Sequence, residues 1–283
     1  VTLSGANTYR GTTLISEGTL AISSEGNLGS NPAAFNAAQL EINGGTLRTT
    51  ASFAMDDSNR GITIGAGHGT IETVAGTELS VDNAIVLGGN LSKTGDGALY
   101  LNGTTSGSGT VTVADGTLGG TGTISGNTVV QSGANLTGGT DGGIGTLTFS
   151  GNLTTDSGST WLIDLVQDVN GSSDLIDVNG TLLDLGGASL SLMTSGSYTL
   201  GNSYTIATFN SLAGTFNGLS DGAIISGYQI NYGTATAGAI TLTAVPEPGT
   251  LGLLGLALGG FFFRRIRRRK SVEGMIEEAE GRD

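Results

Sequence analysis

Short runs in which apolar and polar residues alternate recur along the chain up to about residue 244. Examples are Leu40-Glu41-Ile42, Ile62-Thr63-Ile64 and Val111-Thr112-Val113. Alternation with a period of two puts successive side chains on opposite faces of a strand, so each run predicts a half-buried β-strand. Gly-Asn, Asn-Gly, Asp-Gly and Gly-Gly pairs between the runs are typical of turns. The pattern predicts an all-β protein up to this point.

A Gly-Thr-Leu or Gly-Thr-Ile tripeptide recurs in the first half of the chain. It starts at Gly18, Gly45, Gly69, Gly116, Gly122 and Gly145, with spacings of 27, 24, 47, 6 and 23 residues. A period near two dozen indicates one coil of a solenoid, and the spacing of 47 then indicates two coils. A β-sandwich or barrel is the alternative, but such folds seldom repeat a tripeptide at this interval. We therefore expect a parallel β-helix over residues 1–149.

The texture of the sequence changes near residue 150. Strand-like alternation continues to residue 244, whereas the tripeptide appears only at Gly180. Aromatic residues gather in this part, at Trp161, Tyr198, Tyr204, Phe209, Phe216, Tyr228 and Tyr232. Because the open end of a solenoid must be covered to block edge pairing, we interpret residues 150–244 as the final coils and a β-rich cap.

Three different pieces follow residue 244. They are Val245-Pro246-Glu247-Pro248, an uncharged apolar stretch over residues 249–263, and a basic cluster of Arg264, Arg265, Arg267, Arg268, Arg269 and Lys270. The prolines disfavour helix before residue 249, and the apolar stretch predicts a helix of about 22 Å, shorter than the roughly 30 Å hydrocarbon core. Snorkelling arginines compensate, and the basic cluster predicts a cytoplasmic end. Residues 271–283 form an acidic cytoplasmic tail.

This order of pieces resembles the PEP-CTERM sorting signal of Gram-negative bacteria, over residues 245–270. The resemblance implies recognition and cleavage by an exosortase, a membrane-embedded protease, with Val245, Pro246, Glu247 and Pro248 as the cleavage signal. It also implies a precursor inserted in the inner membrane and a product at the cell surface or outside the cell. The tail beyond Lys270 departs from the usual pattern, and a permanent single-pass anchor is the alternative.

The opening residues resemble a second family, the autotransporter-associated β-strand repeat. Leu3 to Thr13 read Leu-Ser-Gly-Ala-Asn-Thr-Tyr-Arg-Gly-Thr-Thr and are followed by Gly18-Thr19-Leu20, and Leu91 to Gly103 resemble the Lys-x-Gly-x-Gly-x-Leu-x-Leu-x-Gly start of the same module. The resemblance implies secreted, Gly-rich surface proteins with right-handed β-helices. It implies no reaction.

Composition and charge narrow the class of protein. The chain has 283 residues, 51 of them Gly, and no Cys, so packing and hydrogen bonds alone must stabilise an exported fold. Residues 1–245 contain 18 acidic and 4 basic residues, a net charge of −14 that argues against nucleic acid as a partner. The first residues lack the features of a signal peptide, from which we expect that an amino-terminal region is missing.

Catalytic chemistry has little material in this chain. His68 is the one histidine and lies between two glycines, where we expect a solvated turn residue, and no Cys is present. Carboxylates are numerous, so a carbohydrate-active enzyme on a β-helix stays open as an alternative. Asp168, Asn170, Asp174 and Asp177 place oxygen atoms at near-alternate positions and are weak candidates for calcium ligands.

We therefore expect an exported, non-enzymatic β-solenoid with a structural or adhesive role at the cell surface. Its expected partners are an exosortase, the membrane and a surface polysaccharide, without a cofactor apart from the calcium candidates. Autotransporter self-export is a further alternative, although no carboxy-terminal run of barrel strands follows.

Overall fold

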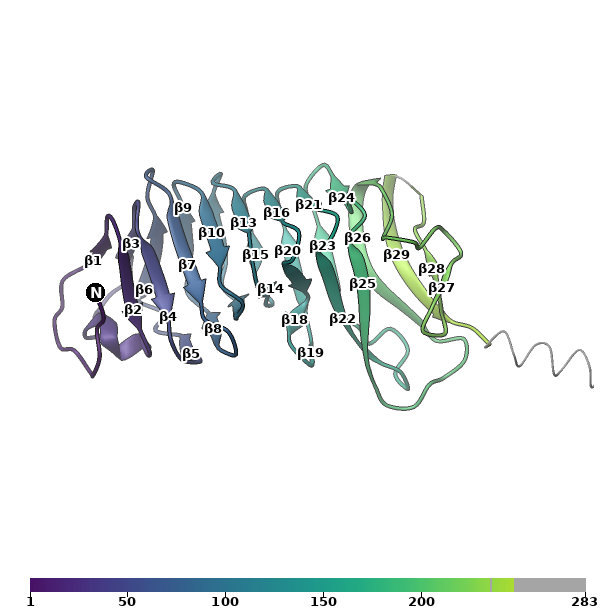
Figure 1. The fold of residues 1–283 in the computed structure, drawn as a ribbon, viewed down its shortest axis with the longest axis horizontal. Coiled ribbons are helices and arrows are strands. Elements are labelled where there is room, and N and C mark those ends of the chain that lie inside the picture. Colours follow the sequence, from purple (N-terminus) through teal and green to yellow (C-terminus); the bar gives the residue numbers. More distant parts are fainter. Residues whose placement is uncertain (235, 247–283) are drawn as a thin grey trace, which may run out of the picture.

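The computed structural model describes residues 1–234 and 236–246, which form a long stack of short strands (Figure 1). Within these residues, the only helical element is a single 3-10 turn, η1 (Glu25–Leu28), and the strands run across the long axis of the molecule. The predicted all-β class is confirmed, and the stacked parallel strands have the arrangement of a β-solenoid.

Each coil of the chain contributes strands to three sides. The first side contains β1 (Thr13–Ile15), β3 (Asn36–Ile42), β6 (Arg60–Ile64), β9 (Ile85–Leu87), β12 (Thr105–Gly107), β15 (Thr123–Ile124), β20 (Thr146–Phe149) and β23 (Leu175–Val178). The second contains β2 (Thr19–Ile22), β4 (Thr46–Thr49), β7 (Gly69–Thr73), β10 (Leu91–Thr94), β13 (Val111–Val113), β16 (Thr128–Val130), β21 (Leu153–Thr155) and β24 (Leu183–Asp184). The third contains β5 (Phe53–Met55), β8 (Glu78–Val81), β11 (Ala98–Leu101), β14 (Thr117–Gly119), β17 (Asn135–Thr137), β22 (Thr160–Val166) and β25 (Ser189–Ser195).

Neighbouring strands on each side pair in parallel, and the register gives the length of each coil. On the second side Thr19 pairs with Thr46 and Thr46 with Thr70, which makes the first coils 27 and 24 residues long. Thr112 then pairs with Val129, a coil of 17 residues, and Thr154 with Asp184, a coil of 30 residues. Coil length therefore varies almost twofold while the register is kept, because the extra residues are placed in the corners.

The core is a set of columns in which one apolar side chain lies above another. On the second side a column runs through Leu20, Leu47, Ile71, Lys93, Val113, Val130 and Thr155. Apart from Leu20, at 9% exposed, these side chains are fully buried. Parallel strands about 4.8 Å apart leave room for branched aliphatic side chains but for few large rings, which explains the low aromatic content of the coils.

The tripeptides mark corners of the solenoid, and only the first three mark the same place in successive coils. Those at Gly18, Gly45 and Gly69 open strands of the second side, as their spacing predicts. Gly116 opens β14 on the third side and Gly122 precedes β15 on the first, so interpreting the spacing of 47 as two whole coils was wrong. A Cβ at Gly116 would collide with the carbonyl oxygens of Gly95 and Gly97, and its φ is +68°.

The parallel stack ends in antiparallel strands. β26 (Ser203–Ala213) is long enough to pair in parallel with both β23 and β24. β29 (Thr236–Ala244) pairs antiparallel with β26, and β28 (Tyr228–Asn231) pairs antiparallel with β29 and with β27 (Ile224–Ile225). Phe216 lies beyond β26 and packs edge-on against the buried Trp161, with ring centroids 5.2 Å apart.

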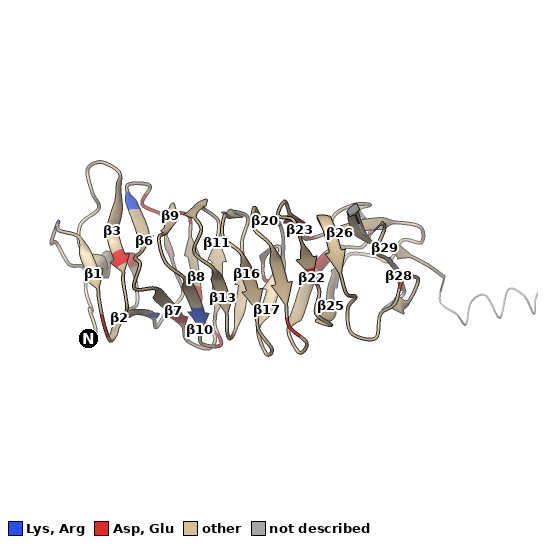
Figure 2. Ribbon diagram, turned by 90° about the horizontal axis from the view of Figure 1, so that it is seen from above, with Lys and Arg blue, Asp and Glu red and all other residues tan. Residues whose placement is uncertain are grey.

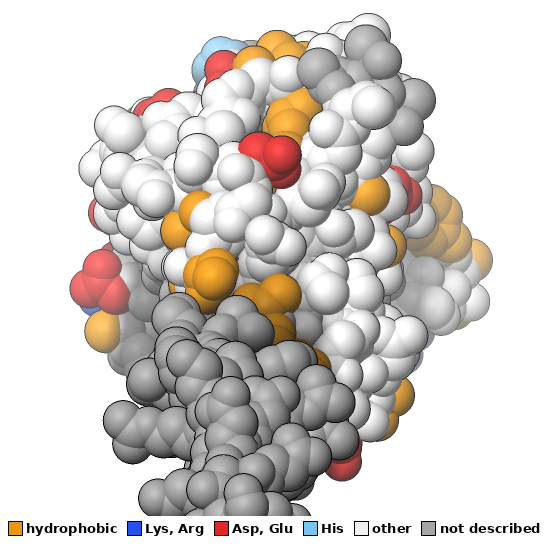
Figure 3. Space-filling view, turned by 90° about the vertical axis from the view of Figure 1, so that its right-hand side faces the viewer, with side chains coloured by type: hydrophobic (Ala, Val, Ile, Leu, Met, Phe, Trp, Pro, Cys, Tyr) orange, Lys and Arg blue, Asp and Glu red, His pale blue; other side chains and the backbone are white. Residues whose placement is uncertain are grey.

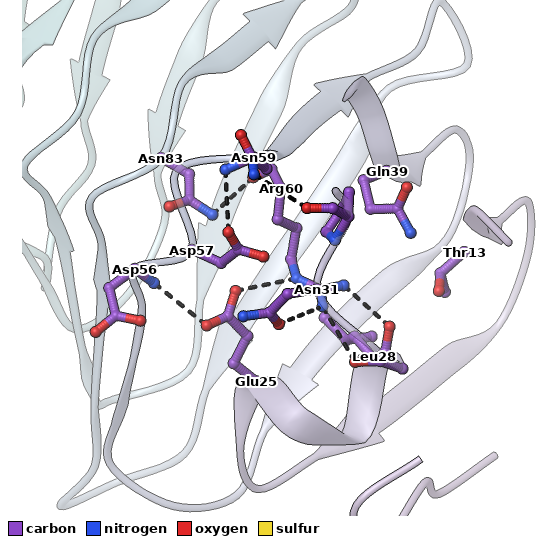
Figure 4. A network of polar contacts seen from close by, with 12 residues as sticks. Thr13, Glu25, Leu28, Asn31, Gln39, Asp56, Asp57, Asn59, Arg60 and Asn83 are labelled. Carbon is purple, nitrogen blue, oxygen red and sulfur yellow. Dashed lines mark hydrogen bonds and ion pairs between the residues drawn. The ribbon is translucent and has the colours of Figure 1, made fainter. Parts of the chain in front are cut away.

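A buried arginine connects the first coils (Figure 4). Arg60, at the start of β6, is fully buried, and its Nε lies 3.0 Å from Oε1 of Glu25 in η1. Its terminal nitrogens donate to the carbonyl oxygens of Leu28 and Gly29, at 2.9 and 3.2 Å, and to Oδ1 of Asn31 at 3.4 Å. The guanidinium thereby satisfies carbonyls at the end of η1, where no strand covers them.

A buried lysine occupies a core position. Lys93 lies in the column between Ile71 and Val113, and β10 carries its blue segment in Figure 2. Nζ donates to three carbonyl oxygens, those of Thr94 at 3.0 Å, Gly95 at 2.6 Å and Asp115 at 3.0 Å. Because Asp115 belongs to the next coil, the ammonium joins two coils at one corner. Burial lowers the pKa of Lys93 to about 8, although nearby carboxylates oppose the shift.

We expect Arg60→Ala to destabilise the fold by about 3–5 kcal/mol, because it leaves Glu25 buried without its partner. The matched control is Arg48→Ala, since Arg48 pairs with Glu72 at 3.4 Å but its side chain is 47% exposed, and exposed pairs contribute about 0–1 kcal/mol. Urea denaturation of both variants measures the difference, and equal losses would contradict the role given to Arg60.

Stability should rise with pH above 8 because of Lys93. The folded state holds this pKa at about 8 and the unfolded chain near 10.5, so between these values the unfolded chain binds the additional proton. The free energy of unfolding then increases with pH by at most about 1.4 kcal/mol per pH unit. Denaturation of the wild type and of Lys93→Met at pH 8 and 9.5 tests this, and a rise of equal size in both proteins would show that another group is responsible.

Candidate functional site

The predicted sorting signal begins where the described chain ends. Val245 is half-buried and Pro246 exposed, directly after β29. Glu247, Pro248 and the basic cluster of Arg264, Arg265, Arg267, Arg268, Arg269 and Lys270 lie outside the described residues, as do the predicted membrane helix over 249–263 and the tail. Among the residues that the structure describes, no helix is both long and apolar enough to cross a membrane.

Val245 is held by two neighbouring segments, and we name Tyr198, Gly227 and Val245 the carboxy-terminal clasp. The backbone nitrogen of Val245 donates to the carbonyl oxygen of Gly227 at 3.0 Å. The hydroxyl of Tyr198 lies 2.6 Å from the carbonyl oxygen of Val245 and 2.7 Å from that of Gly227, so its one hydrogen is shared between two acceptors. All the polar backbone atoms of Val245 are thus engaged.

The sequence explains the geometry of the clasp. Ser226 and Gly227 have φ values of +49° and +85° and form the tight two-residue connection between β27 and β28, as the twist of a hairpin favours. This turn directs the Gly227 carbonyl towards the end of β29. The preceding residue, Ala244, is fixed as well, because its nitrogen donates to Asn202 at 2.8 Å and its oxygen accepts from Gly201 at 3.0 Å.

Behind the clasp lies a cluster of tyrosines. The ring of Tyr228 packs edge-on against Tyr198, at 5.5 Å between centroids, and against Tyr204 at 5.8 Å. Gln167 donates to the Tyr228 hydroxyl at 2.9 Å, and the Tyr204 hydroxyl donates to the Gln167 carbonyl at 2.8 Å. Burial raises the pKa of Tyr228, so the cluster is neutral at physiological pH. Figure 3 views this end of the molecule and shows scattered hydrophobic side chains among white polar and backbone atoms.

A second group of polar residues lies on the outer face of the third side, under a small hairpin. The hairpin consists of β18 (Gly139–Thr140) and β19 (Gly143–Ile144). Its backbone nitrogens at Asp141 and Gly142 donate to the Tyr100 hydroxyl and to Oδ2 of Asp164, each at 3.1 Å. Tyr100 alternates with buried core residues of β11 and is itself only 1% exposed, because the hairpin lies over this face of the sheet.

Asp174 fixes the base of this hairpin. Its Oδ1 accepts from the nitrogen of Gly145 at 2.9 Å, and its Oδ2 accepts from the nitrogen of Asp164 at 3.0 Å and from the hydroxyl of Thr137 at 3.1 Å. Burial raises the pKa of Asp174 to about 6, and the nearby Asp164 adds to the shift. Burial also raises the pKa of Asp164 and that of Tyr100. Because Asp174 already accepts three hydrogen bonds, its role here is structural.

A shallow groove of about 220 Å³ runs beside the hairpin. Its lining includes the carboxylates of Glu78, Asp96 and Asp141 and the hydroxyl groups of Thr77 and Thr117. The walls are polar and acidic, and no histidine lines them. Such a surface suits contact with neutral, hydroxyl-rich or cationic groups, and it lacks the nucleophile and base that covalent catalysis requires.

The candidate calcium ligands do not form one site. Asp174 faces Thr137 and Gly145, whereas Asp177, on β23, accepts from Thr208 at 2.6 Å and from Asn179 at 3.0 Å. Oδ1 of Asn170 accepts from the nitrogen of Ser203. In the described part of the chain, no three His, Asp or Glu side chains are grouped so as to hold a metal. The near-alternate spacing places these residues on both sides of the boundary between a loop and strand β23, so their side chains diverge.

The remaining polar residues are accounted for by local structure. His68 is exposed in a turn with φ of +65°, and its Nδ1 accepts from the nitrogen of Asn90 at 2.9 Å, which agrees with a turn role. Sequence reasoning missed the buried Arg60 and Tyr198. It quoted Lys93 only as part of a motif, although a lysine where the strand pattern calls for an apolar residue was a signal that the side chain has partners inside the fold.

Comparisons with known proteins agree with both resemblances. The model described as PEP-CTERM protein-sorting motif matches residues 244–269, and the model described as passenger-associated-transport-repeat matches residues 1–22 and 91–119. The chain is also similar to the adhesin BmaC autotransporter of Brucella suis biovar 1 (strain 1330), with 39% identity over 116 residues. That similarity covers 39% of this chain, which spans about 3% of the length of the relative. The chain therefore carries passenger-associated-transport repeats and a PEP-CTERM protein-sorting motif, the combination of an exported surface protein.

Proposed function

We propose that the protein is a non-enzymatic, adhesive or structural β-solenoid that an exosortase-type membrane protease releases from the inner membrane to the cell surface or the medium. The observation that carries the proposal is the match to the sorting motif directly after the last strand of a folded β-solenoid. The adhesive role rests on the similarity of the coils to a protein named as an adhesin.

We propose the same organisation of the chain as the sequence predicts. Residues 1–149 are repeat coils, taken as right-handed, and residues 150–244 are the final coils and cap. The antiparallel strands β26 to β29 support the cap, because they occupy the edge at which a further coil would otherwise pair. Residues 245–270 are the sorting signal, with its membrane helix over 249–263 and the cytoplasmic basic cluster, and residues 271–283 are the tail.

The weakly charged outer faces of the coils support a binding role for polysaccharide. Outward positions on the second side carry Thr19, Thr46, Thr70, Ser92 and Thr112 in one register. A flat row of hydroxyl groups offers many hydrogen bonds to a neutral sugar polymer and little attraction to nucleic acid, which the charge of residues 1–245 repels as well.

In a host with an exosortase, we expect the exported product to lack the segment that begins near Pro246-Glu247-Pro248. The intact mass of the product measures this. The control is the same host without the exosortase, where the full mass should be retained. Full-length product in both hosts would contradict the proposal and leave a permanent single-pass anchor as the function of the carboxy-terminal segment.

We expect the purified protein to release no reducing ends from polysaccharides, because its most buried carboxylate, Asp174, is engaged by three hydrogen bonds. A reducing-sugar assay over a panel of polymers, with a known polysaccharide-degrading enzyme as the positive control, tests this. Release of reducing ends that disappears in Asp164→Asn would establish the carbohydrate-active alternative instead.

A further inference from the structure

The matched sorting motif and the folded solenoid overlap in the chain. The match begins at residue 244, and Ala244 is the last residue of β29, where it pairs with Tyr228. Val245 follows within the clasp, so its backbone is fully hydrogen-bonded one residue before Pro246. No spacer separates the last bonded residue of the fold from the Pro-Glu-Pro sequence.

A protease takes its substrate as an extended segment with free backbone groups, and folded residues near the cleaved bond must open first. The active site of a membrane-embedded protease adds a second constraint, because the solenoid body has to stand clear of the enzyme and the lipid surface. With Val245 clasped, the residues just before the motif are unavailable and the body is held against it.

We propose that the carboxy-terminal clasp controls sorting, and that Tyr198 is a positioning residue whose hydroxyl keeps the residues before the Pro-Glu-Pro sequence folded until they enter the protease. This inference rests on the proposed function and deepens it. The clasp has the geometry of a releasable contact. The Tyr198 ring is 41% exposed, its hydroxyl makes the only side-chain hydrogen bond to Val245 found within the described residues, and β29 is an edge of the cap at this point.

The clasp is local, which is why it can open without unfolding the solenoid. Tyr198 lies in a loop after β25 and touches the cap through Gly227 and the Tyr228 ring. The core residues Trp161 and Phe216 pack with each other inside the cap and make no ring contact with Tyr198. Loss of one partly exposed hydrogen bond should therefore raise the open population by about twofold to tenfold and leave the coils intact.

The test uses the full chain in a host with the exosortase, followed by pulse labelling and intact mass. We expect Tyr198→Phe to be processed about twofold to tenfold faster than the wild type, because the processing rate follows the open population when opening is fast relative to cleavage. The matched control is Tyr9→Phe, which removes a hydroxyl bonded to Thr13 at 2.8 Å near the opposite end and should not change the rate.

A second variant separates the clasp from a general loss of stability. An insertion of about ten Gly and Ser residues between Val245 and Pro246 provides a flexible spacer of roughly 18 Å, so processing no longer requires the clasp to open. The insertion should accelerate processing by itself and abolish the additional effect of Tyr198→Phe. Hydrogen exchange at the Val245 amide, measured on the purified folded protein, should be faster in Tyr198→Phe by the same factor as processing.

The outcomes distinguish the two proposals. Processing of the wild type with an unchanged rate in Tyr198→Phe overturns the role of the clasp and leaves the sorting function standing. A Tyr198→Phe effect that persists in the insertion background overturns it too, because the hydroxyl then acts elsewhere. A wild type that the exosortase-containing host does not process overturns both.

Discussion

The parallel pairing of each coil with the next is the constraint on which this structure depends. Once Thr19 pairs with Thr46 and Thr46 with Thr70, every residue of a strand has its inward or outward direction set by the neighbouring coil. A shift by one residue would turn a whole column of core side chains to solvent. The chain has no cysteine, so this register and the columns it creates carry the stability that disulfides give to many exported proteins.

Polar groups inside such a stack need partners, and the corners provide them. Corners interrupt the ladder and leave carbonyl oxygens pointing inward or along the axis. Lys93 and Arg60 each reach three or more acceptors there, and each connects one coil with another. Asp174 has the complementary role as an acceptor for backbone and hydroxyl donors below the small hairpin. The buried charges of this protein therefore hold coils and connections together.

The carboxy-terminal end combines two requirements that oppose each other. The last coil must be covered, since an exposed parallel edge would pair with other chains, and β26 to β29 cover it. The sorting motif must also be accessible, yet its matched region starts on the covering strand itself. A contact as small as the Tyr198 hydroxyl can meet both requirements, because it stabilises the end of β29 without belonging to the core.

The sequence by itself determined the class of the fold and the export signature. Alternating runs such as Ile62-Thr63-Ile64 predict strands because the period of two is a local property, and the Pro-Glu-Pro, apolar and basic pieces follow one another without a gap. The tertiary structure alone decided which corner each tripeptide occupies, since coils of 17 to 30 residues keep one register. It also decided the partners of Arg60, Asp174 and Tyr198, which lie 22 to 47 residues away or are reached across several strands, with Asp164 as a nearer exception. No local pattern records such contacts, because the stacking of coils brings the residues together.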